Sequence, residues 1–350
     1  MIHIETDKPI LLTGASGYMA SWIAHYLLEQ GHTVHGTVRD QHDTHKMGHL
    51  DILDRKHPGK LVLFEADLLD MGAFAEAMQG CGIVIHTASP FKVRTKDPQK
   101  ELIEPALQGT RNVLQTVNEI TTVERVVLTS SVAAVMGDAR EVEDTTSGVL
   151  TEDNWNLSSD LRNQPFAYSK TLAEKEAWRI NQEQERWHLV VLNPAFMLGP
   201  SISSRLDGTS TNFVRQLVNG TFRSGVPDLT YGVVDVRDVA RAHLLAASLP
   251  EARGRHILSA ETCKMIELSR EIKAFFGNKY PLPKRQTAQW WTYLSALFRG
   301  TYSWKFLSSN LGYTFELDNS YSVADLHMEY RPARETLVDQ VKDLEERGLV

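Results

Sequence analysis

Phe166 and Lys170 lie four residues apart in a segment, 164–174, whose sequence is typical of a helix. Because an α-helix has about 3.6 residues per turn, the two side chains share one face and should point into the same cleft. Tyr168 should face away from that cleft. A lysine ammonium beside a phenol stabilises the phenolate, which lowers the phenol's ordinary pKa of about 10 toward neutral pH. Phe166 brings an aromatic ring to this face beside the ammonium, but it has no hydroxyl with which to exchange a proton.

A second group of chemical interest is the hydroxyl cluster Thr129-Ser130-Ser131, which follows an apolar run. If that run is a strand, the cluster lies at the carboxyl edge of a sheet, where doubly wound folds bind their ligands. We predict that Ser131 holds the substrate and that Thr129 borders the cofactor. Ser130 remains the alternative to Ser131, because neighbouring residues of a strand face opposite sides. A pair of serines can also simply cap a turn.

A glycine turn near the N-terminus predicts a dinucleotide site. The apolar residues 10–12 run into Thr13-Gly14-Ala15-Ser16-Gly17-Tyr18-Met19-Ala20, and a helical pattern follows directly. Gly14 permits the sharp turn, Gly17 lets the backbone approach a pyrophosphate, and Ala20 allows the helix to pack closely on the strand. The first N–H groups of the helix and its dipole favour an anion. The residues predicted to contact the pyrophosphate are Gly14, Ser16, Gly17, Tyr18 and Met19.

The choice between NAD and NADP depends on the end of the second strand, Val38-Arg39-Asp40. An NAD enzyme would place an acidic residue there, on the ribose hydroxyls. Arg39 stands there instead, and a guanidinium grips a 2′-phosphate with paired charge-assisted hydrogen bonds. Lys46 adds a second positive charge. These residues favour NADP, while Asp40 keeps NAD as the alternative.

The ends of the third and fourth strands complete the predicted cofactor site. Asp67 and Leu68 follow the third strand, where the carboxylate could accept from the adenine amino group; capping of the next helix is the alternative. Thr87, Ala88 and Ser89 follow the fourth strand, and small residues there let the ribose and phosphate lie against the strand ends. We expect Ser89 to reach the substrate as well.

Short apolar runs alternate with helical patterns through the first two thirds of the chain. This alternation predicts repeated βαβ units, and the near-continuous apolar runs are typical of strands covered on both faces. The predicted strands cover residues 9–13, 33–38, 61–65, 83–87, 125–130 and 188–193. The predicted helices cover residues 19–30, 73–79, 101–117 and 167–183.

The whole pattern predicts an α/β fold, with a Rossmann-type doubly wound parallel sheet and a smaller C-terminal substrate-binding lobe. We expect residues 1–195 plus 232–250 to form the NADP-binding domain and residues 196–231 plus 251–350 to form the lobe. Phe196, Met197 and Tyr231 should line an apolar substrate pocket. The aromatic-rich stretch 290–306 should pack in the core of the lobe, with ligand contact as the alternative.

Composition excludes several classes of protein. The 350 residues carry a net charge of −7, so the chain offers no basic surface to nucleic acid or anionic lipid. The sequence has no signal-peptide pattern and no run of ~18 apolar residues, and we expect a cytoplasmic protein with no membrane partner. Cys81 and Cys263 should be buried free thiols, and no Cys/His cluster could hold a metal such as zinc.

Taken together, these motifs resemble the extended short-chain dehydrogenase/reductases. The resemblance also rests on Ser169-Lys170-Thr171-Leu172-Ala173-Glu174-Lys175, on Asn193-Pro194 with Gly199-Pro200, and on Asp235-Val236-Arg237-Asp238-Val239-Ala240. Within that family the chain is similar to the branch of dihydroflavonol reductase, cinnamoyl-CoA reductase and the microbial carbonyl reductases. The match covers nearly the whole chain, apart from about residues 278–316.

The resemblance implies hydride transfer from NADPH to a carbonyl carbon. A serine, here Ser131, would hold the carbonyl oxygen, while a lysine, here Lys170, would orient the nicotinamide ribose and lower the pKa of a proton-donating tyrosine. Pro194 would pack near the nicotinamide. The family has its tyrosine at the position of Phe166, so we expect a catalytically impaired form of a working reductase, whether the phenylalanine is natural or introduced.

Two other functions stay open. An epimerase or dehydratase of the same family would use a tightly held nicotinamide transiently, and a non-catalytic NADP-binding sensor would have lost its tyrosine naturally. For the reductase we expect a small apolar or aromatic aldehyde or ketone as substrate. We expect the protein to be a monomer or a homodimer.

Overall fold

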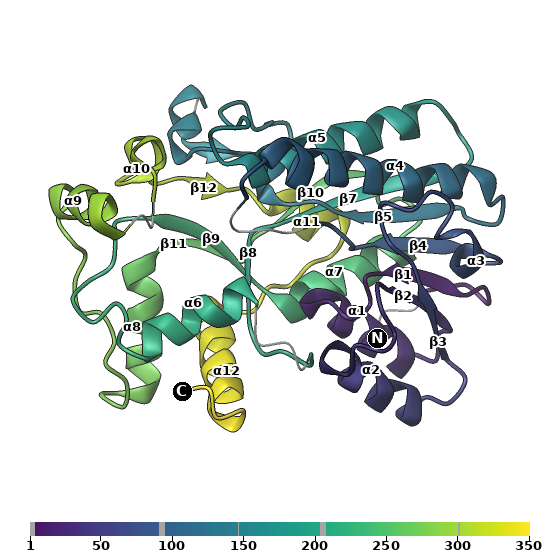
Figure 1. Ribbon diagram of the computed structural model, residues 1–350, viewed down its shortest axis with the longest axis horizontal. Helices are drawn as coiled ribbons and strands as arrows, with labels where there is room; N and C mark the ends of the chain where they lie inside the picture. Colours follow the sequence, from purple (N-terminus) through teal and green to yellow (C-terminus); the bar gives the residue numbers. More distant parts are fainter. Residues whose placement is uncertain (1–3, 91–94, 146, 204–207, 300–301) are drawn as a thin grey trace.

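A computed structural model of the protein describes residues 4–90, 95–145, 147–203, 208–299 and 302–350. Its largest feature is a seven-stranded sheet in the order β10-β7-β5-β4-β1-β2-β3, with every neighbouring pair parallel (Figure 1). The strands are β1 (Ile10–Thr13), β2 (Val34–Val38), β3 (Leu61–Glu65), β4 (Ile83–His86), β5 (Arg125–Thr129), β7 (His188–Pro194) and β10 (Gly254–Leu258). The strand order reverses between β1 and β4, as in a Rossmann-type doubly wound sheet, and this confirms the predicted fold class.

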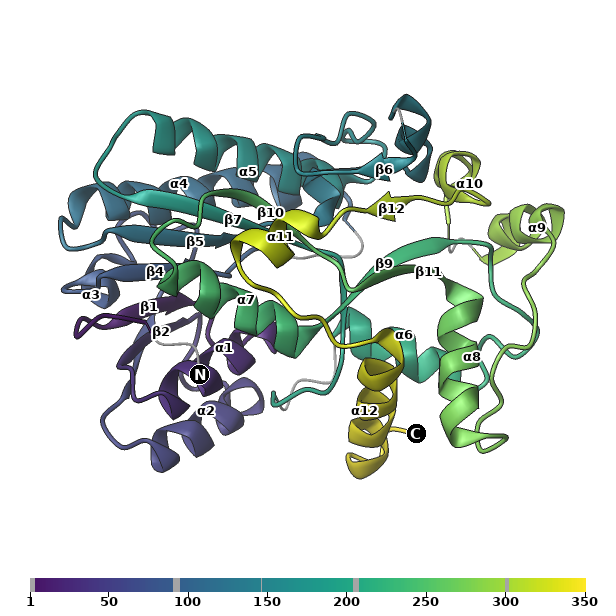
Figure 2. The ribbon, with the colours of Figure 1, turned by 180° about the vertical axis from the view of Figure 1, so that it is seen from behind.

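Helices cover both faces of this sheet, as its buried strands require (Figure 2). One layer holds α3 (Ala75–Met78), α4 (Glu104–Glu119) with its preceding π-helical turn η1 (Gln99–Ile103), and α5 (Pro165–Gln182). The other holds α1 (Tyr18–Glu29), α2 (Thr44–Lys56) and α7 (Val236–Ser248). Ile10 and Leu12 of β1 pack into the core under α1 and α7, while Leu11 between them packs into the core under α4 and α5.

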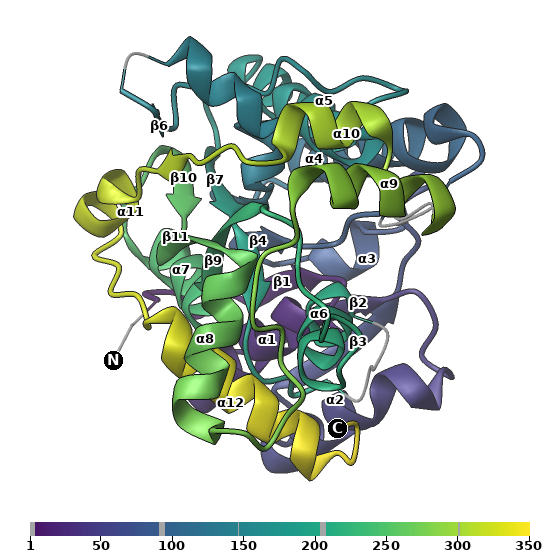
Figure 3. The same cartoon turned by 90° about the vertical axis from the view of Figure 1, so that its left-hand side faces the viewer.

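A smaller mixed sheet in the order β11-β9-β8 continues from the carboxyl side of the large one (Figure 3). Its strands and helices are β8 (Phe196–Leu198), β9 (Thr230–Asp235), β11 (Glu261–Lys264), α6 (Thr209–Val218), α8 (Met265–Phe276) and α12 (Ala333–Glu346). They share a third apolar core, to which α12 contributes Leu337 and Val341. The remaining elements are η2 (Val132–Ala134), η3 (Ala139–Asp144), β6 (Val149–Leu150), α9 (Gln289–Arg299), α10 (Trp304–Asn310), β12 (Glu316–Leu317) and α11 (Ser320–Asp325).

Two strands fall on the other side of the predicted domain boundaries. β10 lies within 251–350, the range predicted for the small lobe, yet it pairs with β7 as an edge strand of the large sheet. Most of β9 lies within 232–250, the range predicted for the large domain, yet it pairs with β8 and β11. The chain therefore crosses between the two sheets as often as predicted, but the second and third crossings come after β9 and after β10, later than the predicted boundaries. The division into a cofactor domain and a substrate lobe stays a prediction.

Three tryptophans of the aromatic stretch 290–306, on α9 and α10, are more exposed than predicted. Trp290, Trp291 and Trp304 are 67%, 51% and 61% exposed, so the prediction that this stretch packs in a core is wrong for all three. Cys81 and Cys263 are buried free thiols, as predicted. Within the described ranges, none of the helices combines the length and apolar character needed to cross a lipid bilayer.

Candidate active site

The glycine turn between β1 and α1 has the shape that a pyrophosphate requires. Gly14 has a φ of +69°, and a Cβ built on it would lie 3.2 Å from the Cα and the Cβ of Ala88. Gly17 is the N-cap of α1, and its N–H donates to the Gly14 carbonyl at 2.9 Å. The N–H groups of Tyr18 and Met19 in the first turn have no intrahelical acceptor, which leaves them for an anion. Ser16 lies in the turn itself.

Only the backbone of Tyr18 faces this turn. Its hydroxyl donates to the Gly199 carbonyl at 2.7 Å, and burial raises its pKa well above the ordinary value. Met19 is buried in the core under α1. The predicted contacts of these two residues with the cofactor are therefore restricted to their amides.

Hydrogen bonds join the ends of β1 and β4. The Thr13 hydroxyl oxygen accepts from the N–H groups of Thr87 and Ala88, both at 3.1 Å, so its own proton goes to His86 Nδ1 at 2.8 Å. Burial, with the positive charge of Lys170 nearby, lowers the pKa of His86 to about 3, so the imidazole is neutral. The Thr87 hydroxyl donates to the Thr13 carbonyl at 2.5 Å. The strand ends on which a cofactor would lie are thus fixed in place.

Arg39 and Lys46, the residues predicted to hold a 2′-phosphate, lie near the carboxyl end of β2. The Arg39 side chain is 79% exposed, and its Nε lies 3.5 Å from Asp67 Oδ2. The Lys46 ammonium pairs with Asp43 at 2.5 Å. Asp67 Oδ1 accepts from the N–H of Leu69 at 2.9 Å, which agrees with a turn-capping role. The proposed adenine contact of Asp67 stays a prediction.

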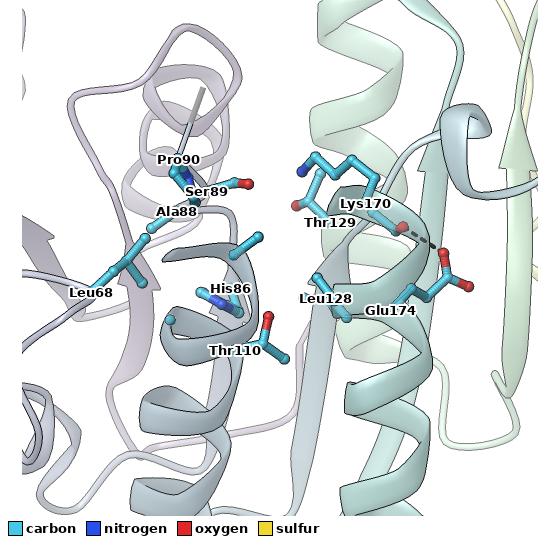
Figure 4. A pocket seen from close by; sticks show the side chains of 14 residues that line it. Leu68, His86, Ala88, Ser89, Pro90, Thr110, Leu128, Thr129, Lys170 and Glu174 are labelled. Atoms are coloured by element: carbon cyan, nitrogen blue, oxygen red, sulfur yellow. Dashed lines mark hydrogen bonds between the residues drawn. The ribbon is translucent and has the colours of Figure 1, made fainter. Parts of the chain in front are cut away.

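A cavity at the carboxyl ends of β4 and β5 contains the ammonium group of Lys170 (Figure 4). Burial lowers the pKa of Lys170 to about 8, against the opposing effect of the Glu174 carboxylate. Its Nζ lies 5.9 Å from the centre of the Phe166 ring, so the ring and the ammonium share one side of α5, as their spacing predicts. The lining includes Leu68, His86, Ala88, Ser89, Thr129 and Ser130.

The two neighbouring serines have different surroundings. Ser130 is 7% exposed and its hydroxyl donates to the Glu174 carboxylate. Ser131 is only half-buried, and its hydroxyl oxygen accepts from the N–H of Ala133 at 3.1 Å. That bond uses a lone pair and leaves the Ser131 proton for a ligand. Of the two, Ser130 lines the cavity, but its hydroxyl proton is taken by Glu174, and the assignment of Ser131 as the substrate-holding hydroxyl stays a prediction.

The Thr129 hydroxyl is engaged on the far side of the strand. It donates to His243 Nε2 at 2.7 Å, because His243 Nδ1 donates to the Val239 carbonyl at 2.7 Å. Burial lowers the pKa of His243 to about 4 and keeps the ring neutral. Thr129 borders the cavity, its proton goes to His243, and its oxygen lone pairs can still accept from a ligand, so its predicted cofactor contact stays a prediction.

A buried carboxylate lies under the site and was not anticipated from the sequence. Glu174 is 1% exposed; its Oε1 accepts from Arg255 Nε at 2.5 Å, and its Oε2 accepts from Asn193 Nδ2 at 2.8 Å and from Ser130. Arg255 also stacks on Trp155, 3.8 Å from the ring centre. One hint of the role of Glu174 was present in the sequence, namely its spacing of four residues from Lys170. Pro194, next to Asn193, is buried at the end of β7.

Aromatic rings gather where the small sheet meets the large one. Phe196 lies 5.2 Å from Phe213 and 5.9 Å from Tyr231, measured between ring centres. Burial raises the pKa of Tyr231, and the neighbouring Tyr302 adds to the rise. Met197 is partly buried and packs on the neighbouring core. The sequence pointed to Phe196, Met197 and Tyr231, whereas Phe213 was missed because it lies on a separate helix.

Comparison with known proteins agrees with this geometry. Residues 10–259 match the model of the "NAD dependent epimerase/dehydratase family". The chain is 42% identical to a cinnamoyl-CoA reductase of Medicago truncatula over 270 residues, 76% of this chain and 80% of the relative. It is 36% identical to cinnamoyl-CoA reductase 2 of Arabidopsis thaliana over 344 residues, 97% of this chain and 93% of the relative.

Two solved structures with a similar fold are also reductases. The yeast methylglyoxal/isovaleraldehyde reductase Gre2, complexed with NADPH, superposes with a TM-score of 0.79 at 27% identity, covering 98% of this chain and all of that one. Vestitone reductase from alfalfa superposes with a TM-score of 0.74 at 25% identity over 98% of this chain and all of that one. The chain therefore belongs to the NAD-dependent epimerase/dehydratase family of extended short-chain dehydrogenase/reductases, in the branch of the cinnamoyl-CoA reductases and related carbonyl reductases.

Proposed function

We propose that this oxidoreductase holds the binding site and all but one of the catalytic groups of an enzyme that reduces a carbonyl compound to an alcohol. The observation that carries the proposal is the half-buried Lys170, whose ammonium lines the cavity 5.9 Å from the centre of a ring that has no hydroxyl, at the carboxyl edge of a dinucleotide-binding sheet. No other part of the predicted site is missing from the described residues. Phe166 therefore impairs a site that is otherwise complete.

The cofactor is NADPH, which supplies the hydride when bound. We assign its pyrophosphate to the turn at Gly14 and Gly17, and its 2′-phosphate to Arg39 and Lys46. Both cations are exposed, and within the described part of the chain each pairs with one acidic side chain, so a phosphate dianion can compete for them. The turn at Gly14 fits a pyrophosphate, because any side chain on Gly14 would occupy the space between β1 and β4.

Each of the chain's own groups has a distinct task in this reaction. The Ser131 hydroxyl donates to the carbonyl oxygen and polarises it. Lys170 holds a ribose hydroxyl and provides the positive charge that would stabilise a phenolate at position 166. The phenyl ring of Phe166 fills that position but has no proton to give to the developing alkoxide.

We assign an aromatic or apolar carbonyl substrate to the ring cluster of Phe196, Phe213 and Tyr231. Flat aromatic groups pack favourably against such rings, and ligand pockets are mostly apolar with few polar anchors. Two of the relatives are named cinnamoyl-CoA reductases, after an aromatic carbonyl compound, and this supports an aromatic substrate here. We place the reaction in the cytoplasm, a reducing compartment that suits the free thiols of Cys81 and Cys263.

Phe166→Tyr tests the proposal directly. We expect the substitution to raise NADPH-dependent reduction of aryl aldehydes and ketones by about a hundredfold or more, because it restores the general acid. The measurement is steady-state consumption of NADPH with each substrate. Tyr168→Phe in the same background is the matched control, since Tyr168 points away from Lys170 and its loss should leave the rate unchanged. Equal rates for the parent and Phe166→Tyr would refute the proposal.

A non-catalytic NADP-binding role is the second candidate, and Phe166 is the observation that favours it. A sensor without a productive substrate pocket would bind NADPH but stay inert after Phe166→Tyr. An epimerase or dehydratase would show conversion of substrate without net oxidation of added NADPH. One assay therefore separates the three functions.

A further inference from the structure

The catalytic helix begins at a residue with an unfavourable backbone conformation. Gln164, the N-cap of α5, has φ 50° and ψ 55°, in the left-handed region that residues other than glycine rarely occupy. Its carbonyl accepts from the N–H of Tyr168 at 3.1 Å and opens the helix. Phe166 lies in the first turn, so the direction of its ring depends on the conformation held at Gln164. Such a conformation persists only where surrounding contacts determine it.

The contacts that hold Gln164 converge on one buried carboxylate, Asp138, which is 5% exposed. Gln164 Nε2 donates to Asp138 Oδ1 at 2.6 Å and to the Gly137 carbonyl at 2.8 Å. Asn163 Nδ2 donates to Asp138 Oδ2 at 2.8 Å and to the Ser158 carbonyl at 3.1 Å. Both residues that precede α5 are therefore fixed by side-chain amides that bind the loop before η3.

A third amide comes from a distant part of the chain. Asn310, at the end of α10, donates from Nδ2 to Asp138 Oδ1 at 2.8 Å, and its Oδ1 accepts from the N–H of Ala139 at 2.9 Å. Asn310 is 7% exposed, so water does not compete for these bonds. The segment that forms α10 also brings Tyr302 to the hydroxyl of Tyr231, in the proposed substrate pocket. One side chain thus connects the substrate side of the molecule with the start of the catalytic helix.

We propose that Asp138, Asn163, Gln164 and Asn310, here called the Asp138 amide cluster, position the ring of residue 166 against Lys170. They are positioning residues that act through α5. Because Asn310 belongs to α10, the position of the ring also depends on where α10 packs. The inference rests on the proposed function, because the position of the ring matters only if a phenol at 166 and Lys170 work together. Its test also has a readout that needs no turnover.

The interaction at stake is that between an ammonium and a phenolate, which weakens as the two separate. Lys170 Nζ lies 5.9 Å from the ring centre; among the described residues, the other titratable or charged groups on the elements that meet at this site include Glu174 on α5, His86 on β4, Asp138 before η3 and Arg255 on β10. Arg255 pairs with Glu174, and His86 is neutral. Among the residues that the structure describes, Lys170 is therefore the cation that we expect to govern the pKa of a phenol at this position.

The experiment uses the full-length chain with Phe166→Tyr and titrates the introduced phenol by ultraviolet difference absorbance against the parent, which cancels the ten native tyrosines. We expect its pKa to lie below the ordinary value of about 10. Adding Asn310→Ala should raise that pKa by about one unit and lower kcat about tenfold, with the NADPH dissociation constant unchanged. Since the phenol must be protonated to act as an acid, the high-pH limb of kcat moves upward as well.

Two comparisons isolate the cluster. Gln164→Ala should act like Asn310→Ala, whereas Gln164→Gly, which tolerates the left-handed backbone, should change the phenol pKa less. Lys305→Ala removes an exposed ion pair with Asp160 from the same helix as Asn310 and should change nothing. If Asn310→Ala does not fold, Asn310→Ser, which keeps a shorter polar side chain, must still raise the pKa.

The outcomes distinguish the inference from the function on which it rests. A lowered phenol pKa in Phe166→Tyr that stays the same in the Asn310 and Gln164 variants would overturn the positioning role and leave the reductase proposal standing. A phenol that titrates at its ordinary value in Phe166→Tyr alone would overturn both. A change in thermal stability without a change in phenol pKa would reduce the cluster to a structural role and so contradict the inference.

Discussion

At the scale of single residues, Lys170 shows that a site arranged for chemistry is costly for folding. Burial lowers its pKa from 10.5 to about 8, so keeping the ammonium charged inside the protein consumes free energy at neutral pH. Its nearest opposite charge, Glu174, is already bonded to Ser130, Asn193 and Arg255. Lys170 therefore keeps its charge with little compensation from its neighbours.

Lys170→Met should consequently make the fold more stable. The folded pKa lies below the unfolded one, so the cost is fully present below about pH 8 and is relieved as pH rises toward the unfolded pKa of 10.5. We expect the free energy of unfolding in urea to increase by about 1–3 kcal/mol at pH 7, with a smaller difference at pH ~10. Lys175→Met, at an exposed position of the same helix, is the control and should have little effect. A less stable Lys170→Met protein at pH 7 would contradict this account.

The sequence could predict part of the residue-scale picture. The pairing of Phe166 with Lys170 follows from helical spacing alone, so it was predictable. The partner of Glu174 was not, because Arg255 lies 81 residues further along the chain and spacing says nothing about such contacts. Ser130 and Ser131 could not be separated until their neighbours were known, since adjacent strand residues differ only in the face they present.

At the scale of elements, the strands of the large sheet were the most predictable. The first six begin and end within one residue of their predicted bounds, because runs of buried aliphatic residues between polar turns have few other interpretations. Helix α2 was not predicted. It is a polar helix in which Met47, Leu50 and Leu53 are the buried apolar residues, so its periodic signal is weak. The turn between β1 and α1 was predictable because its backbone needs a glycine, as the positive φ of Gly14 shows.

Gly14→Ala should strongly weaken cofactor binding with a moderate loss of stability. A methyl group there meets Ala88 at 3.2 Å, and φ of +69° is unfavourable for alanine, so the turn must shift away from the anion. We expect NADPH affinity, measured by calorimetric titration, to fall at least about a hundredfold, and stability to fall by about 1 kcal/mol or more. Gly31→Ala is the matched control, because its φ is +83° but nothing lies within 4 Å. It should lose stability and keep its affinity; parallel losses of affinity in both variants would disprove the assignment.

At the scale of the whole molecule, the C-terminal helix joins the two sheets. The Thr336 hydroxyl donates to Asp235 at the end of β9, and the Gln340 side-chain oxygen accepts from the N–H of Gly199. Asp339 pairs with Arg237 at the start of α7. Sequence patterns could not reveal this arrangement, or the return of β10 to the large sheet, because a strand's composition does not say which sheet it joins.

Leu337→Ala should therefore destabilise the protein far beyond its local region. Leu337 is fully buried between α12 and the small sheet, and deleting such a side chain costs about 2–5 kcal/mol. We expect a single lower urea midpoint that is the same by circular dichroism and by NADPH binding, since α12 connects both parts. Glu346→Ala, on the exposed side of the same helix, should leave the midpoint unchanged. Two separate transitions would show that the sheets unfold independently.

The uncovered indoles of Trp290, Trp291 and Trp304 also make this protein a convenient object for spectroscopy. Trp187, in contrast, is fully enclosed beside the large sheet. We expect water-relaxed emission from the first three and blue-shifted emission from Trp187, so the two signals report on different parts of the molecule. Selective quenching by a small solute can thus follow events around α9 and α10 without any attached dye.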